Sequence, residues 1–228
     1  MIHPRFEPVR ALFQHQLDAG ETLGASFCVI HKGETVVDLA GGFADRERTR
    51  AFERTTLAPV FSVTKLIAAL LVARLNDAGR LRYEDPVASV WPAFAAAGKA
   101  RVTVEEALSH QAGLSGFLDP MTPEDWYDWE GICARLAAMA PLWPPTSASG
   151  YHPVTLGYLA GEIFRRVDGR TMGRALAEDL AAPYGLDLFI GLPPSEDGRV
   201  AELERPRQLP KFGPMTPALK AAFLTKWA

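Results

Sequence analysis

The sequence has few cysteines and no long apolar run, the features that mark disulfide-rich and membrane-spanning proteins. Cysteine occurs only at Cys28 and Cys133, which argues against a disulfide framework and favours a reducing cytoplasm. The longest uninterrupted apolar run, LIAALLVA at 66–73, is far shorter than the roughly 20 residues of a membrane-spanning helix. Charged residues or Gln interrupt every apolar stretch within 1–20, which excludes the apolar region of a signal peptide there. We therefore expect a globular, cytoplasmic protein without a membrane segment.

Positive charge is not in excess either. The 228 residues include 24 Lys and Arg against 27 Asp and Glu, a formal net charge of −3, which argues against a nucleic-acid partner. A Walker loop and a glycine-rich dinucleotide signature are both missing from the sequence. Asp119, Asp125 and Asp128 lie close together, but no His or Cys stands at ligand spacing beside them. We predict neither a metal nor a cofactor.

The apolar pattern predicts one hairpin followed mostly by helices. Two β-rich runs, 27–31 and 34–40, flank a tight turn at Lys32-Gly33, as in an antiparallel hairpin. Two strands alone are marginally stable, so the hairpin either packs on helices or lacks sheet partners. Loops are expected at 44–58 and 115–130. Helical spacing predicts helices over about 8–20, 62–78, 103–113, 132–139, 154–167, 172–181 and 217–227, the third with a capping-box pair at Thr103 and Glu106.

The stretch FSVTK places Ser62 and Lys65 three positions apart at the start of an apolar run. On a helix these side chains share a face, about 5–6 Å apart at Cβ. The helix N-terminus stabilises a negatively charged oxygen, and a partly desolvated lysine can act as a base. The alternative is as simple, because serine is a favoured N-cap and lysine is common on helix surfaces. This spacing alone leaves both interpretations open.

Further stretches favour the catalytic interpretation. Lys65 opens a run that looks buried, and Tyr151 stands just before a helix and after a proline-rich loop. The sequence resembles the serine β-lactamase-like hydrolases, which include class C β-lactamases, DD-peptidases and family VIII carboxylesterases. The resemblance covers most of the chain and implies an α/β (α+β) fold, with an antiparallel sheet packed on helices and a helical subdomain. The matching stretches are FSVTK (61–65), LSHQAGLSG (108–116), GYHPVTLGYLAGEIFRRVDGRT (150–171) and AAPYGLDLFIGLP (181–193).

The resemblance implies roles for three residues. Ser62 would be the nucleophile that forms an acyl-enzyme, and Lys65 its base or proton relay. Tyr151 would carry a proton between nucleophile and leaving group, with its pKa lowered by the lysine ammonium. The family's second motif usually reads Tyr-x-Asn, whereas this chain has Tyr151-His152-Pro153. A proline side chain cannot make that amide's hydrogen bonds to lysine and substrate, which disfavours β-lactamase activity more than ester hydrolysis.

Other residues near these motifs have two interpretations each. His152 contacts the substrate or is a solvated loop residue. Trp143 lines the acyl pocket or packs, as do Trp126, Tyr127 and Trp129. We predict substrate contacts for His152 and Trp143. His110 is expected to hydrogen-bond a loop near the site, with a direct catalytic role as the alternative. Ser115 lacks the G-x-S-x-G spacing of a nucleophile elbow and is read as a turn residue.

One family feature has no counterpart in the sequence. The resemblance implies a third motif, a Lys/His/Trp-x-Gly triplet on a strand whose N–H is one of two oxyanion-hole donors, but nothing after residue 191 has that pattern. Losing one such donor costs about 10²–10³ in rate. We therefore expect the chain to match about the first two-thirds of a family member. The predicted domains are 1–79 with 151–228, an α/β domain with an incomplete sheet, and the helical subdomain 80–150.

The resulting hypothesis is a metal-free serine hydrolase acting on short-chain esters through Ser62, with reduced activity in this chain alone. Its expected partners are a small ester or amide substrate, and either a second copy of the chain or a complementing C-terminal chain. Two alternatives remain: a catalytically silent binding module, and an enzyme of the β-lactamase or DD-peptidase type.

Overall fold

The computed structural model of the chain describes residues 2–204. Contacts divide them into two compact units, 2–60 with 192–204 and 61–191. The predicted domain boundaries after residues 79 and 150 differ from the boundaries of these units and stay a prediction. The helix predicted over 217–227 lies outside the described residues. Within the described part of the chain, no helix is both long and apolar enough to cross a membrane.

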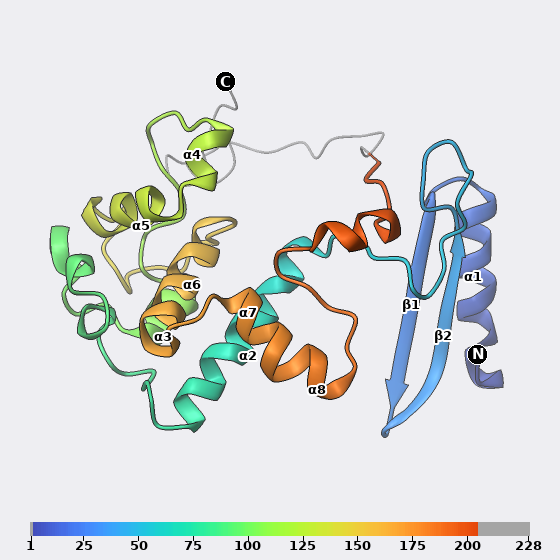
Figure 1. Cartoon of the computed structure of the whole chain (residues 1–228), viewed down its shortest axis with the longest axis horizontal. Coiled ribbons are helices and arrows are strands. Elements are labelled where there is room, and N and C mark those ends of the chain that lie inside the picture. The colour runs from blue at the N-terminus through green and yellow to red at the C-terminus, as the bar shows by residue number, and fades with distance from the viewer. Residues whose placement is uncertain (1, 205–228) are drawn as a thin grey trace. The chain divides into compact units, whose positions relative to one another are not determined.

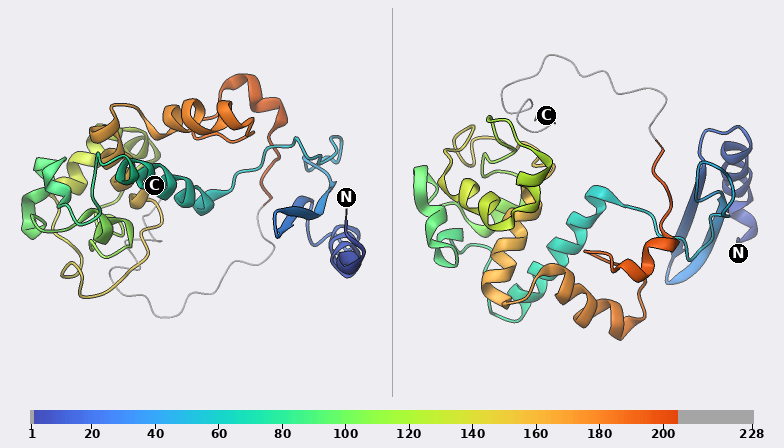
Figure 2. Two further views of the ribbon diagram at one scale, coloured as in Figure 1. Left: turned by 90° about the horizontal axis from the view of Figure 1, so that it is seen from below. Right: turned by 45° about the horizontal axis from the view of Figure 1, so that its top comes forward.

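The first unit is built on the predicted hairpin. Strands β1 (Gly24–His31) and β2 (Glu34–Gly42) pair antiparallel, with an irregularity between Val29 and Ile30. Lys32 and Gly33 both have positive φ, 52° and 83°, as the tightest right-twisting hairpin turn requires. Helix α1 (Glu7–Asp18) follows the short 3₁₀ turn Pro4–Phe6 and lies along β2 (Figures 1 and 2).

Two features complete the first unit. Gly42 has φ 81°, and a Cβ there would lie 2.3 Å from the Leu23 carbonyl oxygen, so the end of β2 requires glycine. The unit also contains a small buried cluster, formed by Ala44, Phe52 and Ala201. The 3₁₀ helix Pro194–Arg199 leads back to this cluster, and Leu57 bridges Val200. Within residues 2–204 the only sheet is β1–β2.

The second unit is helical, and its core lies where α2 packs against α6 (Figure 1). Leu71 and Leu75 of α2 and Leu159 and Ile163 of α6 are buried in one hydrophobic cluster. The helices of this unit are α2 (Thr64–Asp77), α3 (Val104–Leu108), α4 (Pro123–Tyr127), α5 (Trp129–Ala138), α6 (Thr155–Asp168), α7 (Met172–Leu176) and α8 (Ala182–Tyr184), with 3₁₀ segments Phe61–Val63, Val87–Ser89 and Pro92–Gly98 and a π segment Ala177–Ala181.

Most predicted elements of this unit are confirmed, with two differences. The capping box of Thr103 and Glu106 is present, but α3 ends at Leu108, because His110 adopts a left-handed φ of 66°. The loop predicted over 115–130 is wrong where α4 and the start of α5 form. Thr122 and Asp125 make a capping box with proline at the first turn, a start signal that we did not use.

Candidate active site

Ser62 and Lys65 meet at the start of α2. Ser62 lies in the 3₁₀ turn before the helix, where it is exposed, and Lys65 lies in the first helical turn. The Lys65 Nζ donates a hydrogen bond to the Ser62 Oγ at 3.1 Å. The N-cap of α2 is Val63, and no side chain caps the helix. The interpretation of Ser62 as an N-cap is therefore wrong, and its hydroxyl is available for other contacts.

Tyr151 reaches the same serine from the loop before α6. Its Oη donates to the Ser62 Oγ at 2.7 Å, and the Lys65 Nζ lies 5.0 Å from the centre of its ring. The hydrogen bond with Ser62, together with nearby Lys65, lowers the pKa of the Tyr151 phenol, against a smaller opposing effect of burial. The packing of α6 on α2 thus joins three residues that the sequence separates by 89 positions.

The main chain at Pro153 supplies a further contact that sequence reasoning missed. The Lys65 Nζ donates to the Pro153 carbonyl oxygen at 2.7 Å. Lys65 therefore bridges Ser62 and the loop that carries Tyr151. No sequence signal marks this contact, because every residue has a carbonyl and only the tertiary structure decides where it points.

His152 lies between these two contacts and is completely buried, so the solvated alternative is wrong. Its Nε2 accepts from the Leu114 N–H at 2.9 Å, which places the ring proton on Nδ1, 2.6 Å from the Gly150 carbonyl oxygen. Burial lowers the pKa of His152 to about 4. The predicted substrate contact of His152 stays a prediction.

His110 makes the loop contact predicted for it. Its Nδ1 accepts from the main-chain N–H of His152 at 3.0 Å, and its ring centre lies 4.9 Å from that of Tyr151. Burial, followed by the charge of Lys65, lowers the pKa of His110. Both histidines are therefore held in the neutral form and act here as hydrogen-bonding groups of the loop.

Trp143 packs behind the same loop. Its Nε1 donates to the Ala148 carbonyl at 3.0 Å, and its ring meets that of His152 edge-on at 5.8 Å. A Cβ on Gly150 would lie 2.6 Å from this ring, so the residue before Tyr151 must be small. Substrate binding by Trp143 stays a prediction. Of the other aromatic candidates, Trp126 and Trp129 pack on Tyr158, while Tyr127 is exposed.

The burial of His152 predicts acid sensitivity. An unfolded histidine titrates near 6.5, so between about pH 6.5 and 4 the unfolded chain binds a proton that the folded chain excludes. Stability should therefore be complete above pH 6.5 and fall by up to about 3 kcal/mol as the pH drops to 4. Charge on His110 would oppose protonation of His152 in the same direction, whereas the hydrogen bond to the Gly150 carbonyl favours it, and burial outweighs both.

Urea unfolding at pH 7 and pH 4.5 measures this effect. The carboxylates with lowered pKa, such as Glu162 and Asp168, also weaken the fold in acid, so the comparison is with His152→Gln. We expect the wild-type chain to lose more stability than the variant between the two pH values. Equal losses would contradict the assignment.

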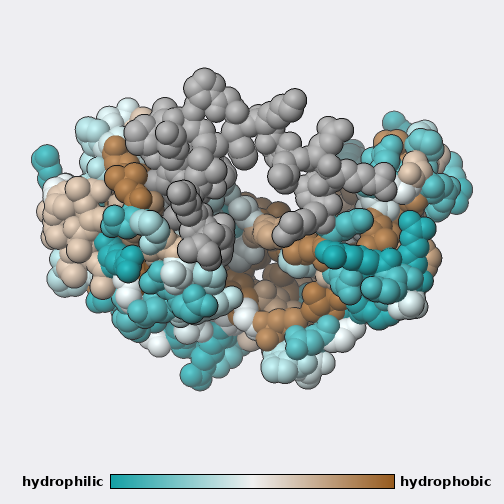
Figure 3. Space-filling view, turned by 90° about the horizontal axis from the view of Figure 1, so that it is seen from above, coloured by the Kyte–Doolittle hydropathy of each residue, from teal (hydrophilic) through white to brown (hydrophobic). Residues whose placement is uncertain are grey.

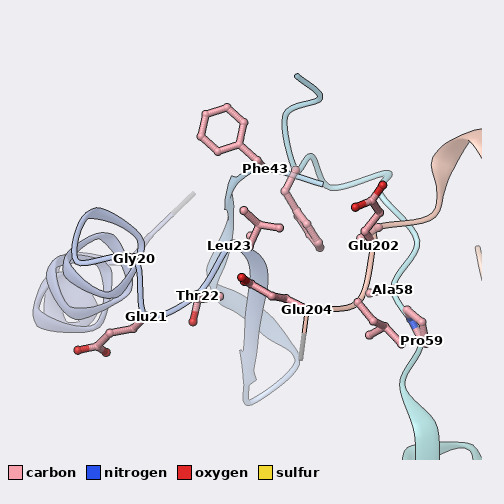
Figure 4. Close-up of a pocket in the computed structure, with 13 residues that line it drawn as sticks. Gly20, Glu21, Thr22, Leu23, Phe43, Ala58, Pro59, Glu202 and Glu204 are labelled. Carbon is pink, nitrogen blue, oxygen red and sulfur yellow. The ribbon is translucent and has the colours of Figure 1, made fainter. Parts of the chain in front are cut away.

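The alternatives to this site would be a metal cluster, the buried cysteine or the cavity of the first unit. Residues 2–204 contain no cluster of three His, Cys, Asp or Glu that could hold a metal. Cys133 is buried, which raises its pKa to about 12 and removes it as a nucleophile. A cavity of about 560 Å³ lies in the first unit, between the start of β1 and the segment carrying Ala58 and Pro59 (Figure 4). None of the site residues lines it.

Known proteins match most of this chain. A family model described as Beta-lactamase matches residues 9–222. The chain belongs to the beta-lactamase family. Among curated relatives of this beta-lactamase-family chain, Esterase/beta-lactamase LipL of Mycobacterium tuberculosis is 37% identical over 219 residues, 95% of this chain and 51% of LipL. Esterase EstB of Burkholderia gladioli is 30% identical over 194 residues, 77% of this chain and 49% of EstB.

Two solved structures superpose closely on this chain. A penicillin-binding protein homologue from Caulobacter crescentus matches with a TM-score of 0.96 and 61% identity, over 100% of this chain and 61% of that one. A family VIII carboxylesterase matches with a TM-score of 0.90 and 44% identity, over 100% of this chain and 61% of that one. The predicted family and β-lactamase-like fold are confirmed. The chain spans about half the length of these curated relatives and about three-fifths of these solved ones.

Proposed function

We propose that this beta-lactamase-family serine hydrolase is a carboxylesterase that forms an acyl-enzyme at Ser62. The observation that carries the proposal is the position of one exposed hydroxyl, which contacts both a lysine ammonium and a tyrosine phenol. A serine nucleophile needs an adjacent base and a path for its proton, and these two groups can supply both. Its relatives include proteins named esterases.

The proposed reaction has two halves. Lys65 as a free amine, or Tyr151 as a phenolate, takes the Ser62 proton while Oγ bonds to the ester carbonyl carbon. Collapse of the tetrahedral intermediate breaks the bond to the alkoxy group, which leaves as the alcohol with a proton from Tyr151; where Lys65 took the serine proton, Lys65 then reprotonates the Tyr151 phenolate. Water then attacks the acyl-enzyme by the same route and releases the acid. The lowered pKa of Tyr151 supports its part in this transfer.

The oxyanion of each intermediate needs donors. The Ser62 N–H, in the turn that leads into α2, is the first candidate. The family resemblance assigns the second donor to a later strand, and no strand is described between residues 192 and 204.

Ester substrates fit the loop better than amides. The side chain of an asparagine at position 153 would offer both a donor and an acceptor. The proline side chain offers neither, and the main-chain carbonyl of Pro153 already binds Lys65. An ester needs no donor of this kind for its side groups, whereas recognition of a β-lactam amide does. This difference supports carboxylesterase over β-lactamase activity.

Intact-mass spectrometry with a fluorophosphonate probe tests the nucleophile. We expect one adduct on the wild-type chain and none on Ser62→Ala. Ser89→Ala is the matched control, because Ser89 is also exposed in a 3₁₀ turn but has only the Pro86 carbonyl as its partner. An adduct that survives Ser62→Ala, or no adduct on a folded wild-type chain, would overturn the assignment. Turnover of p-nitrophenyl acetate without turnover of a chromogenic β-lactam then identifies the esterase.

A second function, binding to another polypeptide, has one observation in its favour. Leu66 and Leu70 lie at helical spacing on α2, Val63 is the N-cap residue before them, and all three are exposed. Figure 3 shows that hydrophobic residues are interspersed with hydrophilic ones on the surface. A chain that takes no probe but self-associates in analytical ultracentrifugation, with association lost in Leu66→Glu, would favour this function.

A further inference from the structure

The loop before α6 presents its residues to two sides. Tyr151, 44% exposed, directs its hydroxyl to Ser62, and the Pro153 carbonyl accepts from Lys65. His152 stands between them with 0% exposure. A proline at 153 also restrains the backbone of His152 to extended conformations. The geometry of both contacts therefore depends on what holds His152 in place.

Four hydrogen bonds hold this loop and the start of α6 against the segment 110–114, and a fifth, within the loop, orients the His152 ring. The His152 ring uses both nitrogens, one toward Gly150 and one toward Leu114, at 2.6 and 2.9 Å. The His152 N–H reaches the His110 ring at 3.0 Å, and the Gly150 N–H reaches the His110 carbonyl at 3.0 Å. The Thr155 hydroxyl donates to the Leu114 carbonyl at 2.6 Å. The His152 imidazole thus links the main chain at Gly150 to the main chain at Leu114.

A simpler explanation is that His152 is an ordinary core residue with satisfied nitrogens. Its partners argue for a more specific role, because they all belong to the loop that carries Tyr151 or to the segment facing it. Replacing the ring leaves the Leu114 N–H, itself buried, without its acceptor. The unsatisfied N–H would weaken the attachment of the loop and leave the packing of the helices intact.

We propose that His152 is a positioning residue, whose buried neutral ring fixes the loop so that the Tyr151 hydroxyl and the Pro153 carbonyl face Ser62 and Lys65. Its kinetic consequence rests on the proposed function, but the positioning itself does not. A displacement of about 1 Å at a reacting group can cost up to about a hundredfold in rate. Loss of the ring should therefore slow acylation without unfolding the helices.

Tyrosine titration followed by NMR tests the positioning without any need for turnover. With ¹³C-labelled tyrosine, and Tyr151 assigned through Tyr151→Phe, the wild-type Tyr151 should titrate below the usual tyrosine range. In His152→Ala we expect its titration to move up toward the ordinary value, because the contact with Ser62 loosens. Leu136→Ala is the control: it removes buried volume from α5, outside this hydrogen-bond network, and should leave Tyr151 unchanged.

The outcomes separate the two proposals. Unchanged titration of Tyr151 in folded His152→Ala overturns the positioning role, whether or not the chain is active. A shifted titration, with fluorophosphonate labelling slowed about tenfold to a hundredfold, supports both proposals. A shifted titration in a chain that the probe never labels supports positioning and overturns the esterase. If the alanine variant unfolds, His152→Leu, which fills the space of the ring but offers no acceptor to the Leu114 N–H, replaces it, and its titration shift decides by the same criterion.

Discussion

Replacing Lys65 with methionine should slow the acylation of Ser62 by about 10²–10⁴-fold. Methionine keeps the length of the side chain and favours helices, so α2 should form normally. The variant loses the donor to the Ser62 Oγ and to the Pro153 carbonyl, and with it the group that can take the serine proton. The pKa of Tyr151 should also rise, because Lys65 helps to lower it. Second-order labelling rates with the fluorophosphonate measure the first effect.

Lys65→Arg separates charge from proton transfer. A guanidinium keeps a positive charge beside Ser62 and Tyr151 but cannot lose its proton at neutral pH. If Lys65 acts as the base, the arginine variant should label as slowly as the methionine variant. Labelling restored to near the wild-type rate would instead mean that Tyr151 takes the proton and that Lys65 only stabilises its phenolate. Wild-type rates in both variants would exclude any role for Lys65.

The second large effect is on stability. Leu159→Ala should lower the free energy of unfolding by about 2–5 kcal/mol, because Leu159 is fully buried where α6 packs on α2. A cavity there loosens the packing between the helix that follows Tyr151 and the helix that carries Lys65. Urea unfolding followed by circular dichroism measures the change. Leu118→Ala, at an exposed loop position, should shift the free energy by less than about 0.5 kcal/mol. Equal midpoints for the two variants would contradict this prediction.

The sequence predicted local features well where chemistry acts over a few residues. The turn at Lys32-Gly33 required positive φ, and the structure has it. The spacing of Ser62 and Lys65 on one helical face also led directly to their observed contact. The helix α4 was missed because its capping signal at Thr122 lies within a stretch rich in tryptophan and proline, which we read as loop.

The roles of Tyr151 and His152 depend on contacts between distant parts of the chain, which the local sequence pattern does not determine. Tyr151 entered through resemblance to a family, since its contact with Ser62 depends on the packing of two helices far apart in sequence. The burial of His152 was not predictable from the adjacent residues in the sequence, because a Tyr-His-Pro tripeptide is equally compatible with an exposed turn. Its partners, Gly150 and Leu114, act through main-chain atoms, which side-chain patterns do not specify.

The contact between Lys65 and the Pro153 carbonyl has a consequence for how this site can evolve. An acceptor on the main chain is present whatever amino acid the codon specifies, so no point mutation at 153 deletes it by changing the side chain alone. The acceptor for Lys65 is therefore independent of the side chain at 153, although proline there also restrains the backbone of His152. An asparagine arising there would add an amide side chain while Lys65 kept its main-chain acceptor. A lineage could thus acquire amide recognition without first passing through a form that has lost its ester chemistry.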